Sequence, residues 1–540
     1  MLNRIEILKF FCLILIGMVG LVGCADTSSY DVIIANGTIV DGTGKPGYKS
    51  DVGIRGETIA KIGNLSKAKS ENRIDATGLI VAPGFLDAHS HSDRTLRSPK
   101  YRTNENFIRQ GVTTCFFGVD GYWNPKTAEN FLKTTKKNGV GTNWAFYMGH
   151  NGIRQAVMKM ENRAPTSEEL ERMKAMVKQG MEMGAVGLSS GLMYLPGRYA
   201  TTDEVIELAK VVAPYDGVYD SHVRDPVNDF LGSVDECIEI GEKSGARPHP
   251  AHHKAVGIPN WGKSKDVSDL VQAAIDRGLD VTVDQYPYDG AATAPLFAVL
   301  VPPQGTPLAK IHEALASPEL REKIKALTEN PPPEVYSWVQ TVGYSSFRIV
   351  VCEKFPDYVG KMLVDIAKEK AVEPFQMIVD IIAEDPDTII TLGACLEDDV
   401  RYIITRPWTI ISSDGATGGS MGHPRSYGTF ARVLGRYVRE WKVLSLEEAV
   451  HKMSGKTAHY FRLKNRGEIN VGYYADIAVF DPDRVIDQSD WAHPDKMAEG
   501  VIHVLVNGDF ALRNEKMTGK LNGQMIPFKG GEYIKQDDEQ

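Results

Sequence analysis

The stretch that decides the fold is Pro83-Gly-Phe-Leu-Asp87-Ala-His89-Ser-His91-Ser-Asp93. Side chains alternate along a strand with a period of two, so Asp87, His89 and His91 point the same way. Two neutral imidazoles on one face are suited to a divalent transition metal. With 13 His in 540 residues, about 0.3 such His-x-His pairs are expected by chance. The His-x-His pair therefore indicates a metal site only if the surrounding strands support it.

The middle of the chain repeats one arrangement, a short apolar strand followed by a helical stretch. This alternation indicates an α/β protein with a parallel sheet, and eight such units are what a (β/α)₈ TIM barrel requires. The helix after Thr166-Ser167-Glu168-Glu169 begins with a capping residue and early acids. The eight candidate strands are Ile80–His89, Val112–Gly118, Trp144–Gly149, Ala185–Ser190, Gly217–His222, Arg247–His252, Asp280–Tyr286 and Thr409–Asp414.

Three further segments complete the expected organisation. Residues 290–408 are too long for one strand-to-strand connection, so we interpret about this range as a helical insertion before the last strand. Residues 31–80 and 466–530 alternate short β-rich runs with turn signals such as Asn36-Gly37 and Asn507-Gly508. We expect both ends of the chain to build one small β domain beside a barrel domain of residues 81–465.

Polar residues stand at the ends of several barrel strands. The fifth strand ends in His222, the sixth runs into His252 and Lys254, and the eighth ends in Asp414. Taken singly, each is more often a packed histidine or a loop-capping aspartate. Together with the His-x-His pair, on these strands and in this order, they predict a metal site at the carboxyl mouth of a barrel.

Composition narrows the class of partner. Asp and Glu number 70 against 61 Lys and Arg, which gives a net charge of −9. Phosphate binding needs a basic surface, so nucleic acid is not expected as a partner. The balance fits an enzyme that acts on a small molecule.

The N-terminus carries an export signal. An apolar run from Ile7 to Val22 is too short for a comfortable membrane span and closes on Leu21-Val22-Gly23-Cys24, which resembles a bacterial lipobox. We expect residues 1–23 to be a lipoprotein signal peptide, Cys24 to carry the lipid, and residues 24–30 to form a tether. The protein would be exported and held at the cell envelope by this lipid alone; a plain signal peptide with a chance Cys is the alternative.

With these motifs, the chain resembles the amidohydrolase superfamily from Val32 to about Gly523. Within that superfamily it resembles the N-acyl-D-amino-acid deacylases, or D-aminoacylases. The resemblance implies a TIM barrel with a small β-sandwich, one or two zinc ions, and hydrolysis of a small N-acyl amino acid. The finer match is carried by Gly187–Gly197, Ser221–Arg224, His252–Lys254, Asp284–Tyr288 and His423-Pro-Arg425-Ser-Tyr-Gly-Thr-Phe.

The resemblance also implies roles for single residues. His89 and His91 would hold the more exposed metal position, and His222 and His252 the tighter one. Asp414 would be the base for the attacking water. The positions that grip the substrate carboxylate match Lys254, Tyr286 and Arg425.

The chain departs from the family pattern at two places. The family usually has Gly-Asn-Cys-Gly after the second strand, with Cys as a metal ligand, and this chain has Gly118-Val-Asp120-Gly121. Carboxylate oxygen also binds zinc, so Asp120 can replace the thiolate, while Cys115 is expected in the core. The second departure is Ala292, which stands where the family usually has a substrate-binding Ser, so specificity can differ.

Two other functions compete with deacylation. Cyclic-amide hydrolases, such as hydantoinases and dihydroorotases, bridge two metals with a carboxylated Lys at the end of strand four. Here that strand is Ala185-Val-Gly-Leu-Ser-Ser-Gly191, without Lys. A catalytically inactive, lipid-anchored binding protein would be expected to have lost a ligand or the base, and all of them are present.

Overall fold

The computed structural model describes residues 29–332, 335–392, 395–418, 422–528 and 530. The expected signal peptide, the lipidation residue Cys24 and most of the tether lie outside the described residues. Strand β1 (Ser29–Ala35) begins at Ser29, within the range expected for the tether, and pairs with β6 (Lys69–Asp75) from its first residue. Among the described helices, none is both long and apolar enough to span a membrane.

Strands from both ends of the chain share one seven-stranded sheet. A second sheet, in the order β5-β4-β1-β6, comes from the N-terminal segment alone and includes β4 (Asp51–Arg55) and β5 (Thr58–Gly63). Buried Val, Ile, Leu and Phe side chains of the two sheets form one core. The seven strands, in sheet order, are β23 (Lys516–Met517), β22 (Asp509–Arg513), β21 (Val501–Val506), β20 (Ile477–Phe480), β7 (Ile80–Pro83), β2 (Thr38–Ile39) and β3 (Tyr48–Lys49).

The parallel strands occur in chain order and form three sheet segments. These are β8-β9-β10, β11-β12-β13-β14 and β15-β19. Their bounds are β8 (Phe85–Asp87), β9 (Val112–Phe117), β10 (Asn143–Phe146), β11 (Met148–Gly149), β12 (Gly187–Gly191), β13 (Val218–His222), β14 (Arg247–Pro250), β15 (Val283–Gln285) and β19 (Thr409–Ile411).

Backbone hydrogen bonds link these three segments. Val186 donates to Phe146 at 2.8 Å, and His253 donates to the Asp284 carbonyl at 2.8 Å. Asp414 donates to the His89 carbonyl at 2.9 Å, which joins the last strand to the first. The three segments of parallel strands are therefore linked to one another, from the first strand to the last.

The first expected strand is two strands. β7 belongs to the small domain's sheet and β8 to the parallel strands, with Gly84 between them. A Cβ at Gly84 would lie 2.2 Å from the Thr113 side chain, so the chain turns from one sheet to the other where only glycine fits. The third expected strand is also divided, into β10 and β11.

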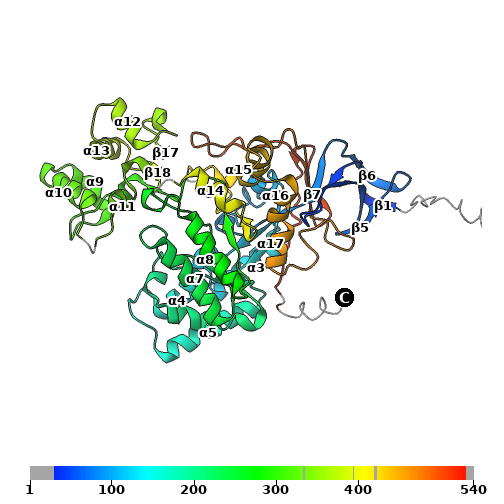
Figure 1. Cartoon of the computed structure of the whole chain (residues 1–540), viewed down its shortest axis with the longest axis horizontal. Coiled ribbons are helices and arrows are strands. Elements are labelled where there is room, and N and C mark those ends of the chain that lie inside the picture. Colours follow the sequence, from blue (N-terminus) through cyan, green and yellow to red (C-terminus); the bar gives the residue numbers. More distant parts are fainter. Residues whose placement is uncertain (1–28, 333–334, 393–394, 419–421, 529, 531–540) are drawn as a thin grey trace, which may run out of the picture.

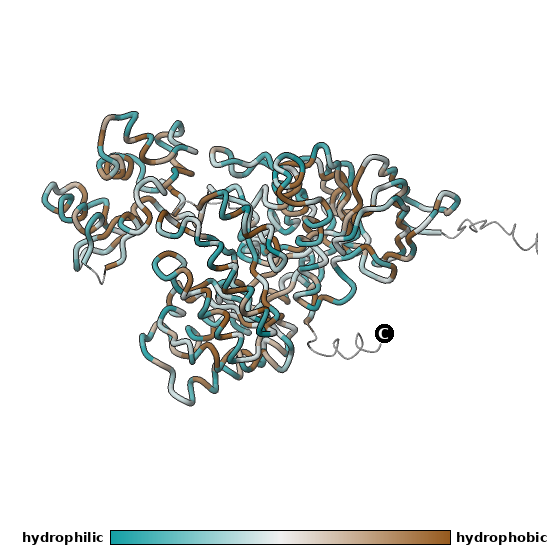
Figure 2. The backbone as a smooth tube through the Cα atoms, viewed as in Figure 1, coloured by the Kyte–Doolittle hydropathy of each residue, from teal (hydrophilic) through white to brown (hydrophobic). Residues whose placement is uncertain are grey.

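Helices follow the strands and cover them. α5 begins with the capping box predicted at Thr166, whose side chain accepts from the Glu169 N–H. Figure 2 shows hydrophobic (brown) and hydrophilic (teal) stretches alternating along much of the chain. The main helices are α3 (Pro125–Asn138), α4 (His150–Met158), α5 (Ser167–Glu182), α6 (Thr202–Ala209), α7 (Phe230–Ser244), α8 (Ser264–Asp276), α15 (Arg425–Arg432), α16 (Leu446–Met453) and α17 (Gly455–Tyr460).

The insertion before β19 is not wholly helical. It contains a three-stranded antiparallel sheet of β16 (Thr293–Pro295), β18 (Ile389–Thr391) and β17 (Ile349–Val351). Its last helix, α14 (Glu397–Ile404), packs on α8 and β19 and so belongs with the helices that cover the parallel strands. Figure 1 shows the rest of the insertion and the small β domain at opposite ends of the long axis. The other helices are α9 (Ile311–Leu315), α10 (Pro318–Glu329), α11 (Trp338–Val342), α12 (Leu363–Glu369) and α13 (Pro374–Glu384).

Candidate metal centre and active site

The predicted metal ligands all follow the carboxyl ends of parallel strands. His89 and His91 come after β8, His222 ends β13, and His252 lies two residues beyond β14. Asp120 lies in the turn after β9, within the short helix η2 (Val119–Gly121). Because these strands are parallel, their ends gather the side chains at one mouth.

Asp120 lies at the centre of the four imidazoles. Its Oδ1 atom is 3.5 Å from His89 Nε2, 3.4 Å from His222 Nδ1 and 3.4 Å from His252 Nε2. Its Oδ2 atom is 3.4 Å from His91 Nε2. The carboxylate therefore takes the position between the two histidine pairs that a bridging ligand would need.

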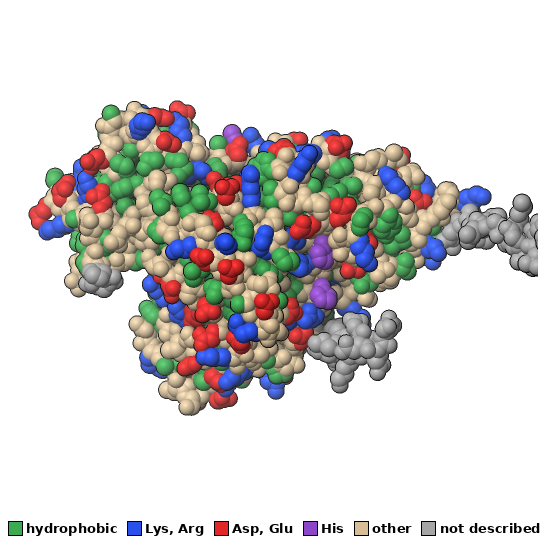
Figure 3. Space-filling view, viewed as in Figure 1, with side chains coloured by type: hydrophobic (Ala, Val, Ile, Leu, Met, Phe, Trp, Pro, Cys, Tyr) green, Lys and Arg blue, Asp and Glu red, His purple; other side chains and the backbone are tan. Residues whose placement is uncertain are grey.

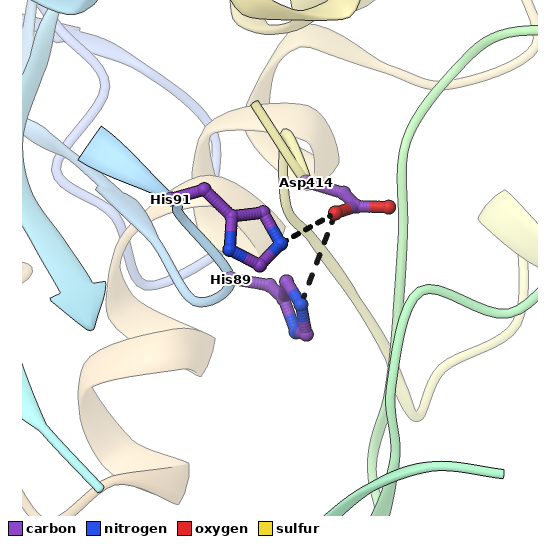
Figure 4. A group of neighbouring side chains, drawn as sticks. All are labelled: His89, His91 and Asp414. Atoms are coloured by element: carbon purple, nitrogen blue, oxygen red, sulfur yellow. Dashed lines mark hydrogen bonds and ion pairs between the residues drawn. The ribbon is translucent and has the colours of Figure 1, made fainter. Parts of the chain in front are cut away.

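The second carboxylate, Asp414, faces the first histidine pair. Its Oδ1 atom is 3.1 Å from His91 Nε2 and 3.9 Å from His89 Nε2 (Figure 4). Its Oδ2 atom accepts from Arg425 Nη1 at 2.6 Å and lies 3.8 Å from Lys254 Nζ. Asp414 thus contacts both the histidine pair and the predicted carboxylate-binding cations.

Two overlapping groups of these atoms are compact enough to hold a metal ion. One group is His89, His91 and Asp414, and the other is His89, Asp120 and His252. Within each group the ligand atoms lie within 4.8 Å of one another. Both nitrogens of the fully buried His89 ring have no hydrogen-bond partner among the described side chains, which suits a metal ligand.

Electrostatics favour a cation at this place. Burial acts to lower the pKa of His89, but the nearby carboxylates of Asp120 and Asp414 raise it to about 10. Burial, together with the Lys254 charge, lowers the pKa of His252 to about 3, which leaves that imidazole neutral as a metal ligand must be. The two carboxylates therefore leave negative charge that a divalent ion would balance.

Three site residues have a left-handed backbone that non-glycine residues rarely adopt. The φ angles are 57° at Asp120, 35° at His252 and 49° at Asp414. Such conformations cost roughly 1–3 kcal/mol each and persist where the surroundings fix them. Asp284 fixes one of them, since its Oδ1 atom accepts from the His252 backbone N–H at 2.6 Å.

Two buried aspartates were not predicted as site residues, although both lie in the quoted motifs. Asp87 accepts from the Ser413 N–H at 2.8 Å and from the Ser413 hydroxyl at 2.5 Å, which ties the strand carrying His89 to the strand carrying Asp414. Asp284 lies 3.1 Å from His249 Nε2 and supports the loop of His252. Asp87 lies two residues before His89 and Asp284 two residues before Tyr286, and this spacing was the available signal.

The three residues predicted to grip a carboxylate lie together. Lys254 Nζ is 4.9 Å and the Arg425 guanidinium 4.8 Å from the centre of the Tyr286 ring. Arg425 is also paired with Asp414, which the sequence did not indicate. Although burial opposes it, Arg425 is the first of the charges that hold the pKa of Asp414 well below its ordinary value.

Cys115 lies in β9, fully buried, and its sulfur accepts from the Asn104 amide at 3.4 Å. It belongs to neither group of possible metal ligands.

Ala292 lines a cavity beside the site. Acidic and basic side chains are interspersed on the face shown in Figure 3, and no broad basic patch is visible there.

Comparison with known proteins gives consistent likenesses. Residues 359–511 match the model of the amidohydrolase family. A D-aminoacylase of Alcaligenes xylosoxydans xylosoxydans is 32% identical over 524 residues, which cover 93% of this chain and 98% of the relative. An N-acyl-D-glutamate deacylase of the same organism is 32% identical over 499 residues, covering 88% and 93%.

A solved structure gives the same likeness in three dimensions. The N-acyl-D-glutamate deacylase of Bordetella bronchiseptica, complexed with zinc and a phosphonate mimic of the tetrahedral intermediate, superposes with a TM-score of 0.75. The two chains are 30% identical, and the match covers 92% of this chain and 100% of the other.

Proposed function

The chain belongs to the amidohydrolase family, in the group that contains D-aminoacylase, and we propose that it is a zinc-dependent hydrolase that removes the acyl group from N-acyl-D-amino acids. The observation that carries this proposal is the convergence of four imidazoles on Asp120, with Asp414 beside them. We also infer that the linked parallel strands close into one eight-stranded barrel with its active site at the carboxyl mouth.

The donor set fits zinc. Imidazole nitrogen and carboxylate oxygen are both ordinary zinc ligands, and each is present in a buried group of three. Asp120, His222 and His252 would hold the tighter ion, and His89 and His91, with Asp120 shared, a second one. A zinc ion held there would polarise the amide carbonyl and lower the pKa of a water molecule towards about 7.

The chain's own residues supply the proton transfers and the positioning. Asp414 accepts the proton of the attacking water and returns it to the departing nitrogen. Lys254, Tyr286 and Arg425 bind the free carboxylate and thereby orient the amide. The product pair is then a carboxylic acid anion and a free D-amino acid.

The two alternatives have less support. A cyclic-amide hydrolase of this superfamily would need a Lys at the end of β12, which here consists of Gly187-Leu-Ser-Ser-Gly191. An inactive binding protein has no need of a buried, strained ligand set, and this chain keeps its ligands and its base together.

The test is a paired activity screen of the zinc-loaded protein. N-acetyl-D- and N-acetyl-L-amino acids are compared with hydantoin and dihydroorotate, and release of the free amine is measured. Hydrolysis confined to the D series supports the proposal. Hydrolysis of the cyclic amides alone, or of nothing by protein that carries zinc, contradicts it.

For location we propose export and lipid attachment at Cys24. The support is the lipobox-like Leu21-Val22-Gly23-Cys24 and the apolar run before it. The only membrane contact would then be the N-terminal lipid.

A further inference from the structure

A cavity of about 220 Å³ lies beside the candidate metal centre. Its lining includes His222, His252 and Lys254. Much of the remaining lining is apolar, and this apolar wall includes Val227, Phe230, Val234, Val256, Trp338 and Leu392.

The residues of this apolar wall come from two parts of the fold. Phe230 and Val234 lie in the first two turns of α7, while Trp338 begins α11 and Leu392 follows β18 in the insertion. Lys254 is the only Lys, Arg, Asp or Glu among the described residues that line the cavity. Apart from Lys254, the lining therefore offers no charged partner to a bound group, and it offers much apolar surface.

The position of the carboxylate-binding residues decides which part of a substrate faces the cavity. This step rests on the proposed function. Lys254 lines the cavity and also lies against the Tyr286 ring. Tyr286 and Arg425, which lie against each other, do not line the cavity. A carboxylate bound over Tyr286 places the amino-acid half of the amide on the side of β15 and α15. The acyl half then continues past His222 and His252 into the cavity.

We propose that this cavity binds the acyl group, and that the preferred acyl group is apolar and much larger than acetyl, about the size of phenylacetyl or hexanoyl. A dry cavity of about 150 Å³ is enough to bind benzene, so 220 Å³ accepts a ring or a short chain. Acetyl would leave most of the apolar wall without contact.

The expected gain follows from burial of methylene groups. Each buried CH₂ contributes about fourfold to binding, so kcat/KM should rise by about that factor per carbon until the cavity is full. The experiment uses zinc-loaded protein and N-acyl derivatives of D-alanine, whose small side chain does not compete for the space. Acetyl, butyryl, hexanoyl and phenylacetyl form the series, and succinyl is the matched control for butyryl with a terminal charge.

A second series keeps acetyl and varies the side chain through D-alanine, D-leucine and D-phenylalanine. The proposal expects a steep rise in the acyl series, a weak dependence in the side-chain series, and poor hydrolysis of the succinyl derivative. A flat or falling acyl series overturns it, and a steep side-chain series would assign the cavity to the amino-acid side chain. If no N-acyl-D-amino acid is hydrolysed, the proposed function itself is contradicted. This outcome differs from a flat acyl series, which contradicts only the assignment of the cavity.

Variants of the wall locate the effect. Val234→Phe should narrow the cavity and lower kcat/KM for hexanoyl and phenylacetyl at least tenfold while leaving acetyl nearly unchanged. Trp338→Ala should move the preference to longer chains. Phe355→Ala, in the same insertion but away from the cavity, is the matched control and should leave the order of acyl groups as it was. If the Val234→Phe protein does not fold, the two substrate series measured with the unaltered protein still test whether the cavity binds the acyl group.

Discussion

Replacing Asp120 by Asn should weaken zinc binding strongly. The change keeps the shape of the side chain and removes the negative charge that lies 3.4–3.5 Å from four imidazole nitrogens. The attraction that is lost is the one between the carboxylate and the divalent ion: at an effective dielectric constant of about 20, even two unit charges about 3.4 Å apart interact by about 5 kcal/mol. Since about 1.4 kcal/mol is a tenfold change, zinc affinity should fall by at least about 10³-fold.

The assay is a competition titration of metal-free protein against a fluorescent zinc chelator. Asp120→Cys should bind zinc far more tightly than Asp120→Asn, because a thiolate restores both the charge and a zinc ligand. Asp216→Asn is the matched control, since Asp216 precedes β13 and so lies at the opposite end of that strand from His222. An Asp120→Asn protein that binds zinc as tightly as the parent would refute the assignment of Asp120 as the central ligand.

Three further outcomes are expected. Asp414→Asn should keep zinc binding by metal analysis and lower kcat by about 10²–10⁴-fold, because a general base is lost; a near-normal kcat would contradict its role. Arg425→Ala should mainly raise KM in steady-state kinetics, least for substrates whose carboxylate is blocked as an amide, and Arg425→Lys should recover only part of the loss, since an ammonium lacks the bidentate fork. Cys24→Ser should release the protein to the soluble fraction or block its processing, as judged by fractionation and intact mass; unchanged membrane association would count against lipidation.

Much of the site could be predicted because it depends on local rules. Period-two alternation places Asp87, His89 and His91 on one face, and each remaining ligand lies at or just after the end of a short buried strand. Parallel strands bring such ends together without any detailed knowledge of packing. Asp120 was predicted on other grounds, from the resemblance to the family: it occupies the turn after the second strand and offers oxygen where the family usually offers sulfur.

The contacts between distant segments could not be predicted in the same way. The division of the first strand depends on the Thr113 side chain, which leaves no room for a Cβ at Gly84. The small sheet inside the insertion pairs residues near 293, 350 and 390, and no short-range pattern specifies that register. The hydrogen bonds from Ser413 to Asp87 cross 326 positions of sequence.

The pairing of Arg425 with Asp414 has the most consequence for the chemistry. The expectation treated one residue as the carboxylate clamp and the other as the base, as if they were independent. At 2.6 Å they share one hydrogen bond, and His91 holds the other oxygen of the same carboxylate at 3.1 Å. The position of the base is thus set jointly by α15 and by the loop after β8. A substrate carboxylate that binds Arg425 must do so without displacing Asp414 from it. Binding of the substrate's charge is therefore coupled to the position of Asp414, the proton acceptor.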